Sequence, residues 1–357
     1  MTKENIVGKK YLIIKQSSLG DIIHVMPVLS AIKEENPDNF IGFVVADKFQ
    51  DVVKNHPLID KLYIVPRNKF KLSKIKIDVF FEYIKIMLEI FKQKYDIAID
   101  LQGILKSAIM LAASCSKRRV MKETAREYSW IFANELIPIN YYRNEDKQAP
   151  LDHLRTLEYV GIKYKEVKCV LPESTIESKA KVDELLKTIE KNKPIIILSP
   201  ATTWINKHWN ENYWSELLNR LTFANVIFTG TNQDKGLIDR IINGSTNKNV
   251  IDISGKTNIN QLLEVFRRAN LVISPDSGSA HLAWGASKPA VFVICCATPP
   301  YIYKPIGEKH KAFPQGEGAC VYCFKRDCPK KEDRYICCSQ VKPEEVYKEI
   351  CHTLNID

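Results

Sequence analysis

Short runs of apolar residues alternate along this chain with longer stretches in which apolar residues recur every three or four positions. The first run, Tyr11–Lys15, precedes a stretch with helical periodicity from Ile22 to about Glu35. Similar apolar runs follow at Phe40–Val45, Leu62–Val65 and Ile97–Asp100. Alternation of strands with amphipathic helices predicts a parallel sheet with helices on both faces.

A second series of strands begins at Ile195–Ser199. It continues through Val226–Thr229, Val250–Ile253, Leu271–Ser274 and Ala290–Ile294. These runs are almost entirely apolar, as expected for strands that are covered on both faces of a sheet. The second half of the chain therefore repeats the α/β organisation of the first.

The charged helical stretch Ser174–Lys193 separates the two series. The chain has 357 residues, which is enough for about two domains of roughly 100–200 residues each. We therefore predict an N-terminal domain over 1–175 and a C-terminal domain over 176–357. Both are expected to be Rossmann-like and doubly wound, with ligands bound in a cleft at the carboxyl ends of the strands.

The formal net charge of +10 suggests nucleic acid, an anionic membrane face or a phosphorylated substrate as a partner. Much of this charge lies between Arg67 and Arg126. The cations there are Arg67, Lys69, Lys71, Lys74, Lys76, Lys106, Lys117, Arg118, Arg119 and Lys122. These residues contain no recognisable nucleic-acid-binding motif. A phosphate-rich lipid surface therefore fits this charge better, and a set of solvated lysines is the alternative.

The stretch Lys71–Lys94 mixes lysines with Ile, Val, Phe, Met and Leu at helical spacing. It fits a basic amphipathic helix on a membrane surface, although a helix packed on the first sheet has the same pattern and is favoured. No apolar run approaches the roughly 18 residues of a membrane span. The start, Met1–Lys15, reads as a strand and not as a signal peptide, so we expect a cytoplasmic protein.

The first strand leads directly into the turn Gln16–Asp21 and a helix. A glycine-containing turn at the end of a strand presents backbone N–H groups to a ligand. Asp21, at the helix start, is expected either to cap the helix or to act as a general base that takes a proton from an acceptor hydroxyl. His24, one turn later, either supports Asp21 or belongs to the core.

Two further turns follow strands of the second series. Ser199–Trp209 contains two threonines and a lysine, which suit a diphosphate; helix capping is the alternative but does not explain Lys207 and Trp209 together. Ser274–His281 offers small residues and a helix N-terminus, where phosphate charge is favoured. Neither a complete Walker motif nor G-x-G-x-x-G is present, which argues against ATP hydrolysis and nicotinamide chemistry.

Taken in order, these segments resemble the lipopolysaccharide heptosyltransferases, the ADP-heptose glycosyltransferases of family 9, which have the GT-B fold. The matching pieces are KQSSLGDIIHVMPVL, YDIAIDLQGILKSA, TARE, SPATTWINKHW, FTGTNQD and SPDSGSAHLAWGASKPAVFV. They extend over nearly the whole chain. The early segment and TARE are most similar to the enzymes that add the first heptose to the Kdo residue of Kdo–lipid A.

This resemblance implies a role for each matching residue. Asp21 matches the catalytic base of an inverting transfer. The positions matching donor contacts are Thr202, Thr203, Lys207, Asp234, Asp276, Ser277, Gly278 and His281, with Asp234 standing where the family usually has a glutamate. Acceptor contacts are expected from Ser18, Gly20, Lys69, Lys71 and Arg126.

The C-terminal segment adds a cysteine-rich tail. Six of the ten cysteines are Cys320, Cys323, Cys328, Cys337, Cys338 and Cys351. Their surroundings resemble the tail of many second-heptose enzymes, so the two ends of the chain point to different acceptors. Their spacing also suits zinc or an iron–sulfur cluster, but reduced structural thiols are favoured over a metal or disulfides in a cytoplasmic protein.

The partners implied are an ADP-sugar, a Kdo–lipid A type glycolipid and the inner face of the cytoplasmic membrane, contacted peripherally by a monomer. No cofactor, metal or nucleic acid is expected. A nucleotide-sugar epimerase is the first alternative, but the basic region counts against it. A binding protein that lost catalysis is the second, and the presence of Asp21 disfavours it.

Overall fold

The computed structural model describes residues 8–67, 77–141, 147–314, 320, 322–332 and 334–356. Contacts within the chain divide it into two compact units, Met1–Glu173 and Ser174–Asp357. The division lies close to the boundary predicted between residues 175 and 176. Each unit is described below by itself.

The first unit alternates strands and helices. Its strands are β1 Lys10–Ile14, β2 Phe40–Ala46, β3 Lys61–Val65, β4 Ile97–Asp100, β5 Arg118–Lys122 and β6 Glu135–Ile137. Its helices are α1 Leu19–Glu35, α2 Ile77–Gln93, α3 Leu105–Ala113 and α4 Ala149–Tyr159, with 3-10 turns η1 Asp47–Val52, η3 Ser129–Phe132 and η4 Ile139–Tyr141.

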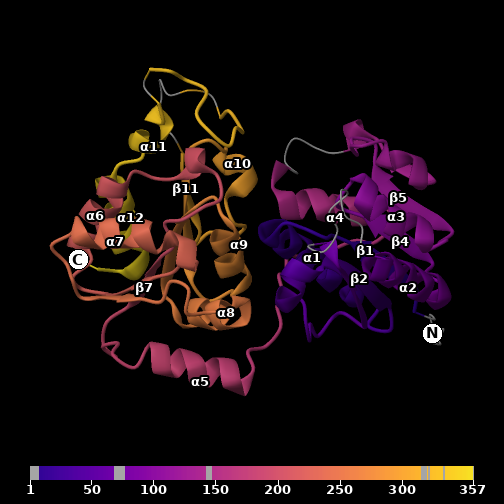
Figure 1. The fold of residues 1–357 in the computed structure, drawn as a ribbon, viewed down its shortest axis with the longest axis horizontal. Coiled ribbons are helices and arrows are strands. Elements are labelled where there is room, and N and C mark those ends of the chain that lie inside the picture. Colours follow the sequence, from indigo (N-terminus) through magenta and orange to yellow (C-terminus); the bar gives the residue numbers. More distant parts are fainter. Residues whose placement is uncertain are drawn as a thin grey trace. The chain divides into compact units, whose positions relative to one another are not determined.

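The six strands form one parallel sheet in the order β3-β2-β1-β4-β5-β6. The strand order reverses between β1 and β4, and at such a switch point the loops diverge and leave a crevice for ligands. Helices α1 and α4 cover one face of the sheet, and α2 and α3 cover the other (Figure 1). Helix α1 is buried over most of its length because both the sheet and α4 pack against it.

The second unit repeats this plan. Its strands are β7 Ile195–Leu198, β8 Asn225–Phe228, β9 Val250–Asp252, β10 Leu271–Pro275, β11 Ala290–Cys295 and β12 Lys311–Pro314. Its helices are α5 Ile176–Leu185, α6 Glu211–Arg220, α7 Lys235–Asn243, α8 Ile259–Arg268, α9 Gly278–Gly285, α10 Pro300–Tyr303, α11 Ile336–Gln340 and α12 Pro343–Leu354, with 3-10 turns η6 Ile205–Lys207 and η7 Asn232–Asp234.

The second sheet is also parallel, in the order β12-β11-β10-β7-β8-β9, with its switch point between β7 and β10. Helices α8 and α9 lie on one face, and α6, α7 and α12 lie on the other (Figure 1). The predicted α/β class and two Rossmann-like units of the GT-B type are confirmed.

Three strands escaped prediction, namely β5, β6 and β12. The apolar centre of β5 is only Val120 and Met121, flanked by cations, so its sequence reads as a basic loop. Strands β6 and β12 stand at sheet edges and are three and four residues long. Short edge strands carry too little periodicity to be recognised from sequence.

Helix α2 occupies residues 77–93 of the helical stretch predicted over Lys71–Lys94. The remaining predicted positions from Lys71 to Lys76 lie outside the described residues. Within the described ranges, none of the helices is both long enough and apolar enough to cross a bilayer.

Candidate active site

Asp21 lies at the start of α1, where it closes a reciprocal cap with Ser18. The Ser18 backbone N–H and hydroxyl both donate to Asp21 Oδ2, at 2.9 and 2.6 Å. The prediction that Asp21 caps α1 is therefore confirmed. It does not exclude the catalytic one, because these bonds hold the carboxylate in place at the switch point of the sheet.

Lys15 gives this carboxylate its charge environment. The Lys15 side chain is buried at the end of β1, and its Nζ donates to the Leu101 carbonyl at 2.9 Å. Burial raises the pKa of Asp21, but the Lys15 charge and the Ser18 hydrogen bonds outweigh it and leave that pKa below its ordinary value. Asp21 is thus an anion at neutral pH and can accept a proton.

The loop after β4 holds the turn that precedes α1. Gln102 Oε1 accepts hydrogen bonds from the backbone N–H groups of Gln16 and Ser17, at 3.2 and 3.0 Å. Arg67 donates from Nη1 to Ser17 Oγ at 2.6 Å. Residues from two other segments, after β3 and after β4, therefore hold the turn beside Asp21.

Buried Asp100 shapes that same loop after β4. Its Oδ1 accepts from the N–H groups of Gln102 and Gly103, at 2.8 and 3.1 Å. Burial raises the pKa of Asp100 to about 6, and the bonds that it accepts only partly offset this. Gly103 has φ +66°, a conformation in which a side chain is strained.

The TARE segment lies against this loop, because the Arg126 N–H donates to the Gly103 carbonyl at 2.9 Å. The Arg126 side chain is exposed. Among the other predicted acceptor contacts, Ser18 is exposed and Gly20 is buried. Lys69 and Lys71 lie outside the described residues. The structure thus gathers Ser18, Asp21 and Arg126 around the switch point of the first sheet.

Three cations of the basic region have partners within the first unit, so less of their charge is available to a lipid surface than the sequence suggested. Arg118 forms a two-pronged ion pair with Glu135. Arg119 donates to the carbonyls of Phe132 and Ser116, at 3.1 and 3.0 Å, and Lys122 forms an ion pair with Asp152. These residues belong to β5, a strand that was not predicted because most of its residues are charged. His24 is buried within α1, as the core interpretation expected.

The second unit joins two predicted donor-binding segments directly. Lys207, at the end of η6, forms an ion pair with Asp276 at 2.5 Å between Nζ and Oδ2. The Lys207 ammonium also lies over the rings of Trp204 and Tyr303, 4.5 and 5.3 Å from their centroids. The turns after β7 and β10 therefore meet at the switch point of this sheet.

Asp276 is the centre of this group and is only 3% exposed. Its Oδ2 also accepts from the Thr298 hydroxyl at 2.9 Å, and its Oδ1 lies 3.3 Å from His281 Nε2. Burial raises the pKa of Asp276, but His281 and Lys207 outweigh it and lower that pKa to about 2. The arrangement holds a buried carboxylate between two potential cations.

The remaining predicted donor contacts lie on the loops around this group. Ser277 occupies the N-cap position of α9, with its hydroxyl 2.8 Å from that of Ser274, and Gly278 begins the helix. Thr202 is half-buried and its carbonyl lies 2.8 Å from His208 Nε2, whereas Thr203 is exposed. Asp234 Oδ2 accepts from the Thr231 N–H and hydroxyl, both at 2.7 Å, so this carboxylate caps its own turn.

Trp209 does not contribute to this site, contrary to the expectation that grouped it with Lys207. It is 2% exposed and its indole donates to the Val341 carbonyl at 2.9 Å. Cys296, Cys337 and Cys338 belong to the same core, and all ten cysteines are free thiols. Across the part of the chain that the structure describes, no three His, Cys, Asp or Glu residues gather as a metal-binding group.

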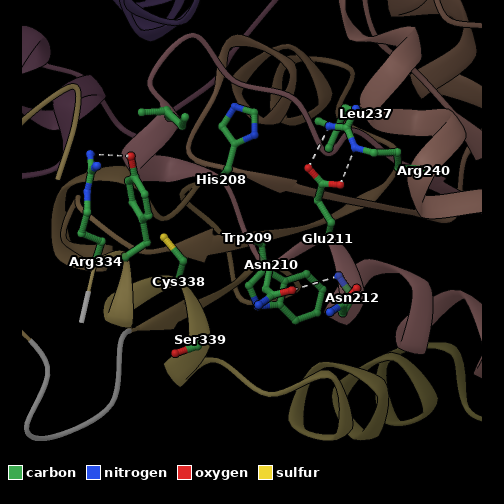
Figure 2. Close-up of a pocket in the computed structure, with 12 residues that line it drawn as sticks. His208, Trp209, Asn210, Glu211, Asn212, Leu237, Arg240, Arg334, Cys338 and Ser339 are labelled. Atoms are coloured by element: carbon green, nitrogen blue, oxygen red, sulfur yellow. Dashed lines mark hydrogen bonds and ion pairs between the residues drawn. The ribbon is translucent and has the colours of Figure 1, made fainter. Parts of the chain in front are cut away.

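A pocket of about 680 Å³ in the second unit opens beside the cysteine-rich tail. Figure 2 shows His208, Glu211 and Arg240 along it, with the Arg240 guanidinium paired to Glu211. None of the predicted donor-binding residues lines this pocket. Its walls come instead from η6, the start of α6, α7 and residues 334–339, so we do not assign the donor to it.

Four residues with contacts in these groups were missed from the sequence. Lys15 ends an apolar strand that must be covered on both faces, and a lysine there signals a buried cation. Gln102 lies next to the glycine of the recognised LQG motif. Thr298 lies in the loop after β11 and Tyr303 ends the short helix α10, and no sequence pattern distinguishes either residue.

Comparison with known proteins identifies relatives over nearly the whole chain. The family model of glycosyltransferase family 9 (heptosyltransferase) matches residues 84–333. Lipopolysaccharide heptosyltransferase 1 of Campylobacter coli is 30% identical over 307 residues, covering 82% of this chain and 85% of that protein. A family 9 glycosyl transferase from Veillonella parvula superposes with a TM-score of 0.80 at 18% identity, covering 98% of each chain. An E. coli heptosyltransferase solved with ADP-2-deoxy-2-fluoro heptose has a TM-score of 0.70 at 19% identity, with coverages of 96% and 99%.

Proposed function

The chain belongs to glycosyltransferase family 9, and on that premise we propose that it transfers heptose from ADP-heptose to the Kdo region of the lipopolysaccharide inner core. The names of its relatives support the sugar and the acceptor class. The observation that carries the proposal is the pair of charged groups at the two switch points. Asp21 stands at one, and Lys207 with Asp276 stands at the other.

The donor diphosphate belongs at the Lys207 group in this proposal. Lys207 supplies a cation held by Asp276 and two aromatic rings. The N-terminus of α9, an eight-residue helix beginning at Gly278, adds backbone N–H groups and a favourable dipole. Hydroxyls of Thr202 and Thr203 donate to phosphate oxygens, and Asp234 accepts from the ribose. Lys207 and the helix end stabilise the departing ADP, so the proposal requires no metal or other cofactor.

Asp21 is the general base. As the acceptor hydroxyl oxygen attacks the anomeric carbon, the hydroxyl proton passes to the Asp21 carboxylate and the bond from the anomeric carbon to the diphosphate oxygen breaks. The new glycosidic bond forms with inversion, and ADP leaves with the bonding electrons. The lowered pKa of Asp21 keeps the carboxylate ionised, and hydrogen bonds from Ser18 fix its orientation.

The acceptor is Kdo–lipid A in this account. Arg126, Lys69 and Lys71 pair with its anionic groups, and the turn containing Ser18 and Gly20 binds beside the reacting hydroxyl. The protein works as a monomer in the cytoplasm, in peripheral contact with the inner face of the membrane. That location follows from a lipid-anchored acceptor.

An acceptor that already carries a heptose is the second candidate, suggested by the cysteine-rich tail. The structure gives the cysteine-rich tail a structural role. Trp209 bonds to Val341, and Cys337 and Cys338 pack in the core of the second unit, so these tail residues stabilise the unit. The tail therefore has little weight in the choice of acceptor.

The test is a transfer assay with purified protein, ADP-heptose and detergent-solubilised Kdo–lipid A. We expect ADP release together with the gain of one heptose on the acceptor, detected by mass spectrometry. ADP-glucose and UDP-heptose serve as donor controls and should react poorly. Equal rates with all three donors would overturn the assignment of the donor.

A further inference from the structure

Helix α2 carries two apolar faces, and only one of them is buried. Val79, Ile86 and Ile90 point into the core of the first unit, at 1%, 9% and 0% exposure. A helix on a sheet ordinarily has one apolar stripe and a polar outer face. The outer face of α2 departs from this rule.

The outer stripe of α2 consists of five large apolar side chains. They are Ile77, Phe80, Phe81, Leu88 and Phe91, with exposed fractions of 75%, 51%, 63%, 51% and 53%. Positions 77, 81, 88 and 91 are separated by four, seven and three residues, so they align along one side of the helix, and position 80 lies at the edge of that side. Single exposed apolar residues are normal, but a continuous row of this kind marks an interaction surface.

Neighbouring elements of the same layer also expose large apolar side chains. Helix α3 packs beside α2 on the same face of the sheet (Figure 1), and η3 packs against α3. Leu105 of α3 is 42% exposed, and Trp130 and Ile131 of η3 are 43% and 59% exposed. Leu, Phe and Trp together are the side chains that enter the interfacial region of a bilayer.

Helix α2 carries three acids and two lysines, and the order of these charges around the helix favours an anionic bilayer as the partner. At about 100° per residue, Lys85 and Lys92 lie directly beside the outer stripe. Both are exposed, and neither forms an ion pair within the described ranges. The acids Asp78, Glu82 and Glu89 lie farther around the helix, towards its buried face. With the stripe inserted, the lysines would reach the headgroups and the acids would remain in water.

From this arrangement we propose that the outer stripe of α2 is the docking surface by which the protein binds an anionic phospholipid bilayer. The inference deepens the proposed function, because a transferase acting on a lipid-anchored acceptor must reach a membrane. It nevertheless rests on the surface alone and requires neither ADP-heptose nor Kdo–lipid A.

The direct test measures co-sedimentation with phosphatidylcholine vesicles, with and without phosphatidylglycerol, in the absence of substrates. We expect binding to the anionic vesicles. The F81E/L88E variant should bind at least about tenfold more weakly, because two apolar anchors are lost and two anions are added. The control I176E changes an exposed apolar residue outside the stripe, Ile176 on α5, which is 88% exposed, and should bind like the wild type.

A second variant tests the charge separately. K85E/K92E should lose binding to anionic vesicles most clearly at low salt, whereas K179E/K181E on α5, an equal change of charge at exposed positions, should have a smaller effect. All substituted side chains are exposed, and circular dichroism with thermal melting checks that the fold is kept. Failure of the wild type to bind anionic vesicles overturns the proposal, as does equal loss of binding in the α5 controls.

Two readouts separate this inference from the proposed function. If heptose transfer proceeds in detergent but vesicles are not bound, only the docking surface is wrong. If vesicles are bound as expected but no heptose is transferred, only the proposed function is wrong. A dimer in solution that F81E/L88E converts to a monomer, without any vesicle binding, would show that the stripe contacts a second copy of this chain instead.

Discussion

Asp21 combines a structural and a proposed chemical role in one carboxylate. Its bonds to Ser18 cap α1, while Lys15 stabilises its charge. These roles can be separated, because an asparagine keeps an oxygen that accepts from Ser18 but cannot take a proton.

We expect Asp21→Asn and Asp21→Ala to lower kcat by a similar factor of about 10²–10⁴, as for loss of a general base. Only the alanine variant should also lose about 1 kcal/mol of stability through the missing cap. Steady-state kinetics and urea unfolding provide the two readouts, and calorimetry should find ADP affinity unchanged in both. An asparagine variant with near-normal kcat would remove Asp21 from the chemistry.

Lys207 pairs with the buried carboxylate of Asp276. Lys207→Ala should weaken ADP binding about 10–100-fold, since charged hydrogen bonds contribute roughly 1.5–3 kcal/mol. It should also lower the melting temperature, because Asp276 loses its cation. Lys181→Ala, at an exposed position on α5, is the matched control. Unchanged ADP affinity, measured by calorimetry, would contradict the diphosphate assignment.

The pKa of Asp100 and the pKa of Asp276 are shifted in opposite directions, so the two residues should affect the pH dependence of stability in opposite ways. Burial raises the pKa of Asp100 to about 6, so the folded state binds more protons than the unfolded state, and stability falls as pH rises from about 4 to 6. The lowered pKa of Asp276, about 2, acts in the other direction, and its contribution is lost as pH falls below about 4.

The Asp100→Asn variant should therefore be more stable than the wild type above pH 6 by up to about 2–3 kcal/mol. It should also show a flatter profile between pH 4 and 6, since an amide oxygen can still accept from Gln102 and Gly103. Urea unfolding across this range provides the test. A variant whose profile keeps the full slope of the wild type would show that other groups cause it.

At the scale of elements, Trp209 shows how the cysteine-rich tail is joined to the second unit. The side chain is buried and bonds to Val341, just before α12. Trp209→Ala should cost about 3–5 kcal/mol of unfolding free energy, the usual range for a buried tryptophan. Trp209→Phe should cost less, because it removes mainly the hydrogen bond. A strong loss of ADP affinity in the folded phenylalanine variant would return Trp209 to the donor site.

Strands with clear apolar patterns could be predicted from sequence, whereas strands stabilised by ion pairs could not. The runs at β1, β4 and β7 lie within a residue of their predicted positions because burial on both faces selects continuous apolar sequence. In β5, Arg118 and Lys122 are accommodated by Glu135 and Asp152. Those partners are distant in sequence, so the charges read as a surface.

The residues of the candidate sites could likewise be predicted only in part. Asp21, Lys207 and Asp276 were identified because a polar turn directly follows an apolar strand. Their supports, such as Lys15 and Thr298, come from elements whose proximity only the fold establishes. The exposed side of α2 lay within a predicted helix, but periodicity alone could not show that its second apolar face has no cover.

For the whole molecule, the division into two compact units predicts that ADP slows hydrogen exchange mainly in the unit that binds it. Binding at 100 times Kd should stabilise the folded state by about 2.7 kcal/mol. Hydrogen exchange should slow mainly in the second unit, around 199–207 and 276–281, with little change around Asp21 in the absence of acceptor. Equal protection of both units, measured by mass spectrometry, would contradict a donor site confined to the second.

The account as a whole depends on one transfer reaction. Its most direct test offers the purified protein ADP-heptose with Kdo–lipid A, or with the same acceptor already carrying one heptose, and follows ADP release. We predict release with the bare Kdo acceptor alone, and release that is about 10²–10⁴-fold slower from the Asp21→Asn variant. Release only with the heptosylated acceptor would contradict the proposed acceptor, and no release with either would contradict the proposed reaction.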